Sequence, residues 1–202
     1  MTVLVFDTET ESLPIWDAPS ADPRQPHIIQ LAMIQYGDDG TELSTRSVLI
    51  RPEGWEIVPG TKASLVHGIT QERALAEGIS EHQAVALWLN AVARASVTVA
   101  HSHPFDARIM RIAMCRAGYQ KDIVDFLGER PSFCTASKSR LIVNLPPTEK
   151  MLASGRNTPK QPSLAEAYRY FFKEEIEGAH EALVDARAAA RIFWHLKGLG
   201  VT

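Results

Sequence analysis

A hairpin signal near the start of the chain constrains the fold most. Two apolar runs, residues 28–36 and 43–50, are separated by the Asp-Asp-Gly turn at residues 38–40. Turn residues between two apolar runs are typical of a β-hairpin. The compact apolar run at residues 3–6 predicts a buried strand before it, and four prolines within residues 12–27 predict a long loop between them. The N-terminal part therefore predicts three strands.

The rest of the chain alternates helix signals with one short strand. Ser80 is a plausible N-cap, Pro104 suits the first turn of a helix, and Gly118 suits a helix end. A polar loop is expected at 144–162. The expected elements are helices near 62–66, 71–76, 81–95, 104–116, 136–143, 163–172 and 183–197, with a strand at 97–100. This order predicts an α/β protein, a mixed sheet with helices packed on it.

Bulk composition excludes some classes of function. The 202 residues fit one domain, 1–202, and the longest apolar runs fall short of a membrane span. The first ten residues read as a strand and not as a signal peptide. Cys115 and Cys134 lack metal-ligand spacing, so we expect reduced thiols and a cytoplasmic protein. A net charge of −3, from 21 basic and 24 acidic residues, argues against coating nucleic acid through bulk charge but allows an acidic metal site.

Two acids extend the apolar face of the first strand. Strand side chains alternate with a period of two, so Val3, Val5, Asp7 and Glu9 share one face. Like charges that lie this close repel each other unless a cation lies between them. The alternative is that the strand ends before Asp7 and both acids are solvated in a turn.

Two helices repeat the pattern, because an acid heads each apolar stripe. One stripe is formed by Asp106, Ile109, Met110, Ala113 and Ala117, and the other by Asp185, Ala189, Ile192 and Leu196. An acid in a first turn also favours the helix dipole, which is the simpler reading of each helix alone. His180 precedes the second acid by five residues; a lone histidine there is often an ordinary surface residue.

Together, the four acids favour a metal site. Burying unpaired carboxylates costs several kcal/mol each, and their convergence from three elements makes sense if hard cations lie among them. All-oxygen ligands favour Mg²⁺ or Mn²⁺, whereas zinc would call for more histidine or cysteine. We therefore predict a cation site formed by Asp7, Glu9, Asp106 and Asp185.

Three motifs resemble the DEDDh (DnaQ-like) 3′→5′ exonucleases, and the chain looks most like the epsilon proofreading subunit of bacterial DNA polymerase III. Phe6–Thr10 matches the Asp-x-Glu motif, 101–106 resembles the second motif, and 180–185 matches His-x-x-x-x-Asp. The segment 66–70 resembles one common in the epsilon-like group. The chain departs from the family pattern after Thr10, where Glu-Ser-Leu and the proline-rich insertion follow, and at Ser102, where asparagine is common.

The resemblance implies a ribonuclease H-like fold, with a central mixed sheet of about five strands flanked by helices, and a two-metal mechanism with two Mg²⁺ or Mn²⁺ ions. Asp7 would bridge both ions, Glu9 and Asp185 would hold the nucleophile-side ion, and Asp106 the other. His180 would be the general base, because an ordinary histidine titrates near neutral pH. Products should be nucleoside 5′-monophosphates.

The same resemblance suggests substrate contacts. Thr8, Thr10, His67, His101 and Phe105 are the candidates for binding the 3′-terminal nucleotide, with packing or capping as the alternative for each. Five basic residues in and before the long loop are either phosphate guides or a solvated surface: Lys138, Arg140, Lys150, Arg156 and Lys160.

Three functions stay open. We expect an enzyme acting on single-stranded or frayed DNA 3′ ends; the alternatives are an RNA exonuclease like ribonuclease T or oligoribonuclease, or a catalytically silent, polymerase-associated binding module. The chain ends soon after its last expected helix, without a tail that would tether it to a polymerase, so we expect a free-standing exonuclease or one bound through its surface. Polymerase association at 1:1 stoichiometry would contradict this, and a homodimer stays open.

Overall fold

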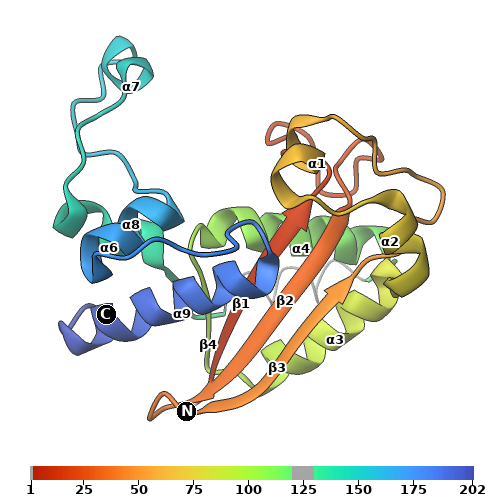
Figure 1. The fold of residues 1–202 in the computed structure, drawn as a ribbon, viewed down its shortest axis with the longest axis horizontal. Coiled ribbons are helices and arrows are strands. Elements are labelled where there is room, and N and C mark those ends of the chain that lie inside the picture. Colours follow the sequence, from red (N-terminus) through yellow and green to blue (C-terminus); the bar gives the residue numbers. More distant parts are fainter. Residues whose placement is uncertain (1, 120–129) are drawn as a thin grey trace.

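The computed structural model describes residues 2–119 and 130–202. Its centre is a five-stranded sheet with the strand order β3-β2-β1-β4-β5 (Figure 1). β1 pairs antiparallel with β2, which pairs antiparallel with β3, whereas β4 and β5 continue the sheet in parallel. The predicted mixed sheet of five strands is confirmed. The strands are β1 (Thr2–Thr10), β2 (Ile28–Gly37), β3 (Glu42–Leu49), β4 (Val97–Ala100) and β5 (Ser132–Cys134).

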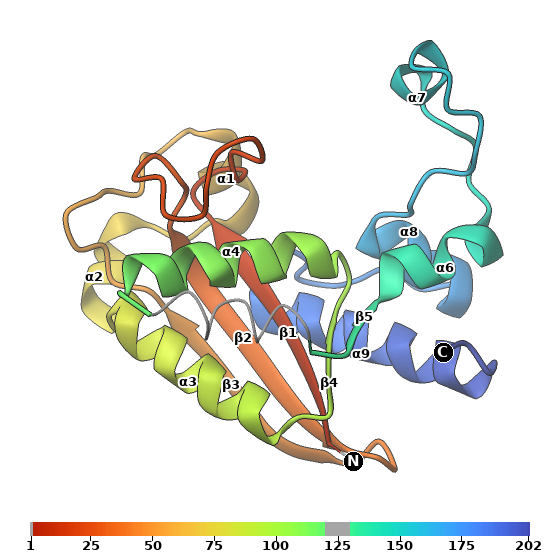
Figure 2. The ribbon, with the colours of Figure 1, turned by 180° about the vertical axis from the view of Figure 1, so that it is seen from behind.

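Helices cover both faces of the sheet. α3 and α4 pack on the face that carries Leu4 and Phe6, while α9 packs on the face that carries Val3 and Val5 (Figures 1 and 2). The helices are α1 (Lys62–His67), α2 (Gln71–Glu77), α3 (Glu81–Arg94), α4 (His103–Arg116), α6 (Thr135–Val143), α7 (Glu149–Ala153), α8 (Leu164–Phe172) and α9 (Ala182–Gly198). β1 thus presents one apolar face to α3 and α4 and the other apolar face to α9.

Local signals explain where several helices begin. Ser80 caps α3 and Ser163 caps α8, each through a capping box in which the third helical residue reaches back to the cap. α4 begins at His103, one residue before Pro104, and the predicted loop at 144–162 contains the short helix α7. In the two described ranges, no helix is long and apolar enough to cross a membrane.

Two strands differ from the sequence-based expectation. β1 continues beyond Phe6 to Thr10, because Asp7, Thr8 and Glu9 pair with β2. The two acids therefore lie within the sheet and not in a solvated turn. β5 was not expected as a separate strand, since its three residues are too short to show a strand periodicity.

Candidate active site

The last residues of β1 place two carboxylates beside α9. Asp7 pairs with Ala32 and Glu9 with Gln30, and the register shifts between Glu9 and Thr10. Both acids are partly exposed and share the face of Val3 and Val5, as the alternation predicted. Irregularities of this kind occur at strand ends next to active sites, where they redirect side chains.

Asp106 reaches the same strand from α4. It is only 3% exposed, and its Oδ1 accepts hydrogen bonds from the Thr8 backbone N–H at 3.0 Å and the Thr8 hydroxyl at 2.8 Å. Thr8 lies between Asp7 and Glu9 in sequence, so these two bonds fix Asp106 against the strand that carries the other acids. The acid that heads the apolar stripe of α4 is therefore more than a helix-dipole residue.

Asp185 and His180 complete the cluster at the start of α9. The backbone N–H of His180 donates to Asp185 Oδ2 at 3.2 Å, and His180 adopts a left-handed backbone with φ of 69° that leaves its side chain exposed. Glu9, His180 and Asp185 each place one potential ligand atom within 4.8 Å of the other two. The structure thus brings together residues that are more than 170 positions apart in the chain.

A glutamine that the sequence analysis did not single out clamps the start of α9. Gln30 is 5% exposed; its Nε2 donates to Glu181 Oε1 at 2.7 Å, and its Oε1 accepts from the Ala182 N–H at 3.1 Å. Glu181 is the N-cap of α9 and accepts from Val184. Gln30 also pairs with Glu9 of β1, so this residue links the end of β1 to the start of α9. The available signal was an amide among apolar neighbours in a strand, because a buried amide needs partners.

Burial and mutual repulsion raise the pKa of all four carboxyls. Burial, followed by the charge of Asp185, raises the pKa of Glu9 to about 8. Burial raises the pKa of Asp106 to about 7 although the Thr8 hydrogen bonds oppose the shift. Burial and the neighbouring acids raise the pKa of Asp7, and burial raises that of Asp185 against the hydrogen bond from His180. The cluster therefore disfavours its own fully ionised state.

The carboxylate oxygens of the cluster are suitable ligands for a divalent cation. Asp185 Oδ1 is buried and has no hydrogen-bond partner among the described residues. An ionised carboxylate oxygen in that position needs a donor or a cation. Positive charge among the four acids would also relieve the repulsion that raises their pKa values. Carboxylate oxygens are suitable ligands for Mg²⁺ or Mn²⁺.

A pocket of about 490 Å³ adjoins Glu9. One wall is the end of β1 and the following residues, the opposite wall is α1, and Phe105 of α4 contributes an aromatic side chain. Its lining residues include Thr8, Thr10, Leu13, Lys62, Val66 and Phe105. The Thr8 hydroxyl is bonded to Asp106 and the Thr10 hydroxyl donates to the Ser12 carbonyl at 2.8 Å, so both threonines shape the pocket with their hydroxyls already engaged.

Two of the five substrate-binding candidates do not line this pocket. His101 is 7% exposed, with Nδ1 bonded to the Thr135 hydroxyl at 2.8 Å and Nε2 to the Pro162 carbonyl at 3.0 Å. His67 ends α1, where its Nδ1 accepts from the Ile69 N–H at 2.9 Å. Both ring nitrogens of His101 hold neighbouring groups, whereas His67 uses only Nδ1 in this way, and its buried Nε2 has no hydrogen-bond partner among the described residues.

The basic residues of the 138–160 region have local partners in several cases. Lys160 forms an ion pair with Glu166 at 2.6 Å, Lys138 donates to the Thr202 carbonyl, and Arg156 bonds to Ser154. α7, which carries Lys150, stands away from the sheet in both views (Figures 1 and 2). Their role as phosphate guides stays a prediction.

Comparison of the sequence with models of protein families identifies the family of this chain. The model of the exonuclease family RNase_T matches residues 4–193, nearly the whole chain, and the chain therefore belongs to this family of exonucleases. The resemblance to DnaQ-like exonucleases is confirmed at the level of the family, while the narrower likeness to the epsilon subunit stays an expectation. No curated protein sequence matches the chain significantly.

Solved structures of exonuclease I share the fold. E. coli exonuclease I in complex with a dT13 oligonucleotide superposes with a TM-score of 0.71 at 18% identity, covering 97% of this chain and 41% of that one. The zinc-bound form of an E. coli exonuclease I–ssDNA complex gives 0.72 at 18%, over 98% and 40% of the two chains. Exonuclease I from Methylocaldum szegediense gives 0.71 at 20%, over 98% and 40%. The chain thus spans about 40% of the length of these proteins.

Proposed function

We propose that the chain is a metal-dependent 3′→5′ exonuclease of the DEDDh type that removes nucleoside 5′-monophosphates from DNA 3′ ends, single-stranded or frayed. The observation that carries the proposal is the convergence of Glu9, His180 and Asp185 within 4.8 Å, together with the buried oxygen of Asp185 that has no hydrogen-bond partner in residues 2–119 and 130–202. Membership of the exonuclease family supports the reaction class.

Asp7, Glu9, Asp106 and Asp185 would hold two divalent ions, Mg²⁺ or Mn²⁺. When bound, such ions supply positive charge at the scissile phosphate and make water a stronger nucleophile. The protein contributes the positions of its ligands: Thr8 fixes Asp106, and Gln30 fixes the start of α9 and hence Asp185.

His180 would act as general base. Its exposed ring lies beside Glu9 and Asp185, within reach of solvent, and a neutral imidazole nitrogen can take a proton from water. The water oxygen attacks phosphorus, the water proton passes to His180, and the bond from phosphorus to the 3′ oxygen breaks. The 3′ oxygen takes up a proton and leaves as a hydroxyl, which gives a nucleoside 5′-monophosphate and a strand one nucleotide shorter.

The pocket beside Glu9 would bind the 3′-terminal nucleotide. Phe105 offers an aromatic face, and every base has a face that can stack on it. Thr8 and Thr10 border the same pocket and would shape it around the sugar. We do not place His101 in contact with substrate, because both of its ring nitrogens are engaged in local structure. His67 stays a candidate, because only its Nδ1 is engaged.

DNA is the first candidate substrate because the similar fold of E. coli exonuclease I has been solved with a dT13 oligonucleotide. RNA is the second, and the 2′-hydroxyl is the group by which a site would distinguish the two.

The test uses purified protein with 5′-labelled single-stranded DNA and a matching RNA, in Mg²⁺, Mn²⁺ or EDTA, alongside Asp7→Ala. We expect a ladder that shortens from the 3′ end and disappears in EDTA and in the variant. The ratio of the DNA and RNA rates then selects the substrate. If neither strand shortens with either metal, the proposal is wrong, and a binding module that keeps the motifs becomes the better account.

A further inference from the structure

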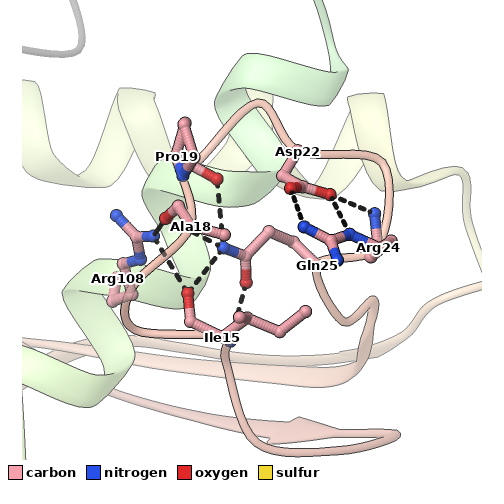
Figure 3. Close-up of polar contacts among 7 residues, drawn as sticks. All are labelled: Ile15, Ala18, Pro19, Asp22, Arg24, Gln25 and Arg108. Atoms are coloured by element: carbon pink, nitrogen blue, oxygen red, sulfur yellow. Dashed lines mark hydrogen bonds and ion pairs between the residues drawn. The ribbon is translucent and has the colours of Figure 1, made fainter.

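The loop between β1 and β2 is held in one shape by a buried amide. Gln25 is 1% exposed, and its Nε2 donates to the carbonyls of Ile15 at 2.9 Å, Pro19 at 3.0 Å and Ala18 at 3.3 Å (Figure 3). Its Oε1 accepts from the Ile15 N–H at 3.0 Å. Loops of this length without helix or strand are usually either functional or disordered. Four hydrogen bonds from one side chain make this loop an ordered one.

Two arginines of α4 attach the loop to the helix that carries Asp106. Arg108 donates to the Ala18 carbonyl (Figure 3). It also donates to the Ser20 hydroxyl at 2.9 Å. Arg116 donates to the carbonyl of Gln25 at 2.9 Å. Because Arg108 follows Asp106 by two residues, the loop and a carboxylate of the active site share one rigid support.

The loop presents apolar side chains to solvent. Leu13 is 76% exposed, Trp16 57% and Ile15 37%, while the polar Gln25 is buried. This is the reverse of the usual arrangement, and clustered exposed apolar side chains mark binding sites. The backbone on both sides of the Ile15 α-carbon is bonded to Gln25, so the adjacent Trp16 sits on a fixed backbone.

The charges of the loop favour contact with the bases of a nucleic acid over contact with its phosphates. Its arginine, Arg24, is paired with Asp22 at 2.7 Å, its histidine, His27, stacks on Trp55, and Asp17 is exposed. The charge of the loop's arginine is therefore offset by a neighbouring acid, and Asp17 repels phosphate. An apolar aromatic surface suits the faces of unpaired bases, on which stacking tolerates any sequence.

The loop also continues the wall of the nucleotide pocket, because Glu11, Ser12 and Leu13 line that pocket together with Glu9. We propose that the loop is a preorganised stacking platform for single-stranded substrate, and that Trp16 stacks on a base upstream of the 3′-terminal nucleotide. This rests on the proposed exonuclease function and adds a strand-binding subsite to it.

The experiment compares a long and a short substrate. dT12 reaches beyond the terminal pocket, whereas the p-nitrophenyl ester of thymidine 5′-monophosphate fills the pocket alone. For Trp16→Ala, we expect the ratio of kcat/KM for dT12 to kcat/KM for the ester to fall roughly tenfold, mostly through KM, because one stacked base contributes about that much. Trp16→Phe should restore most of the ratio. Gln25→Ala, which frees the loop, should lower it in the same direction.

Tyr170→Ala is the matched control, since Tyr170 is an aromatic residue of α8 that is 42% exposed and lies outside the loop. It should leave the ratio within twofold of the wild type. A ratio unchanged in Trp16→Ala, with an active wild type, would overturn the platform and favour another polypeptide segment as the cover of this surface. An equal loss on both substrates would also overturn it. A wild type inactive on both substrates would reject the exonuclease function itself, so the two failures are distinguishable.

Discussion

The two halves of β1 meet the same helix with opposite chemistry. Val3 and Val5 are 5% and 0% exposed and pack on the apolar stripe of α9, which includes Ala189 and Ile192. Two residues further along the same face, Asp7 and Glu9 meet Asp185 in the first turn of that helix. One strand face and one helix stripe thus hold an apolar half and a carboxylate half.

The apolar half of β1 contributes to stability, whereas the carboxylate half serves function. The apolar half removes hydrocarbon from water and stabilises the fold. The carboxylate half collects like charges whose pKa values are raised by burial and by one another, which is unfavourable in the protein alone. Such an arrangement is typical of functional sites, where stability is given up for chemistry. Mutations in the two halves should therefore act on different quantities.

The largest effect is expected in the carboxylate half. Asp185→Asn keeps the shape of the side chain but removes its charge, so it should reduce kcat/KM on single-stranded DNA by on the order of a thousandfold, or about 4 kcal/mol in the barrier. Steady-state rates in Mg²⁺ measure this. Thermal unfolding in EDTA should show no loss of stability, and a large loss there would contradict the separation.

Ile192→Ala tests the apolar half. Ile192 is fully buried on the α9 stripe, and its truncation should lower the free energy of unfolding by about 2–5 kcal/mol. Denaturant unfolding measures the loss. The activity per folded molecule should stay within twofold of the wild type at a temperature where both remain folded. A large drop in the activity of the folded protein would show that the halves are not independent.

Gln30→Ala tests the start of α9, where the carboxylate half meets the apolar half. The variant loses the bonds to Glu181 and Ala182, so the start of α9 is less well positioned, and we expect activity to fall by about 10–100-fold. Gln35→Ala is the control on the same strand, because Gln35 bonds to the Ala91 carbonyl at 3.2 Å on the α3 side. Equal effects of the two variants would reject a positioning role for Gln30.

The smallest effect concerns stability and pH without metal. Burial raises the pKa of Glu9 from an ordinary value of 4.5 to about 8, so the folded protein binds a proton more tightly than the unfolded chain. Stability from this group is present at low pH and is lost as the pH rises from about 4.5 to 8. Glu9→Gln should therefore raise the free energy of unfolding in EDTA at pH 8 by roughly 1–2 kcal/mol.

Unfolding in EDTA at pH 5 and at pH 8 tests this prediction, because the gain in Glu9→Gln should be smaller at pH 5. In Mg²⁺ the wild type should regain stability that the variant does not. A variant less stable than the wild type at pH 8 in EDTA would show that the ionised Glu9 carboxylate does not destabilise the folded protein.

Periodicity and spacing predicted much of this arrangement, because both depend on local sequence. The alternation along β1 placed Asp7 and Glu9 on the face of Val3, and the apolar stripes of α4 and α9 placed an acid at the head of each. β5 was missed because three residues carry no periodicity. The contacts of Gln30 with Glu181 and of Gln25 with the loop were missed as well, since side-chain bonds to distant backbone leave no spacing pattern.

Calorimetric titration of Mn²⁺ into the wild type and Asp185→Asn at pH 7.5, in buffers with different ionisation enthalpies, shows whether the four carboxylates form a cation site. Glu9, with a pKa of about 8, is mostly protonated at this pH in the metal-free protein, and Asp106, with a pKa of about 7, is protonated in a minority of molecules. A cation that binds among them must displace those protons. We expect Mn²⁺ to bind the wild type with release of about one proton, and to bind the variant much more weakly. Binding that releases no proton, or equal binding to both proteins, would contradict this expectation.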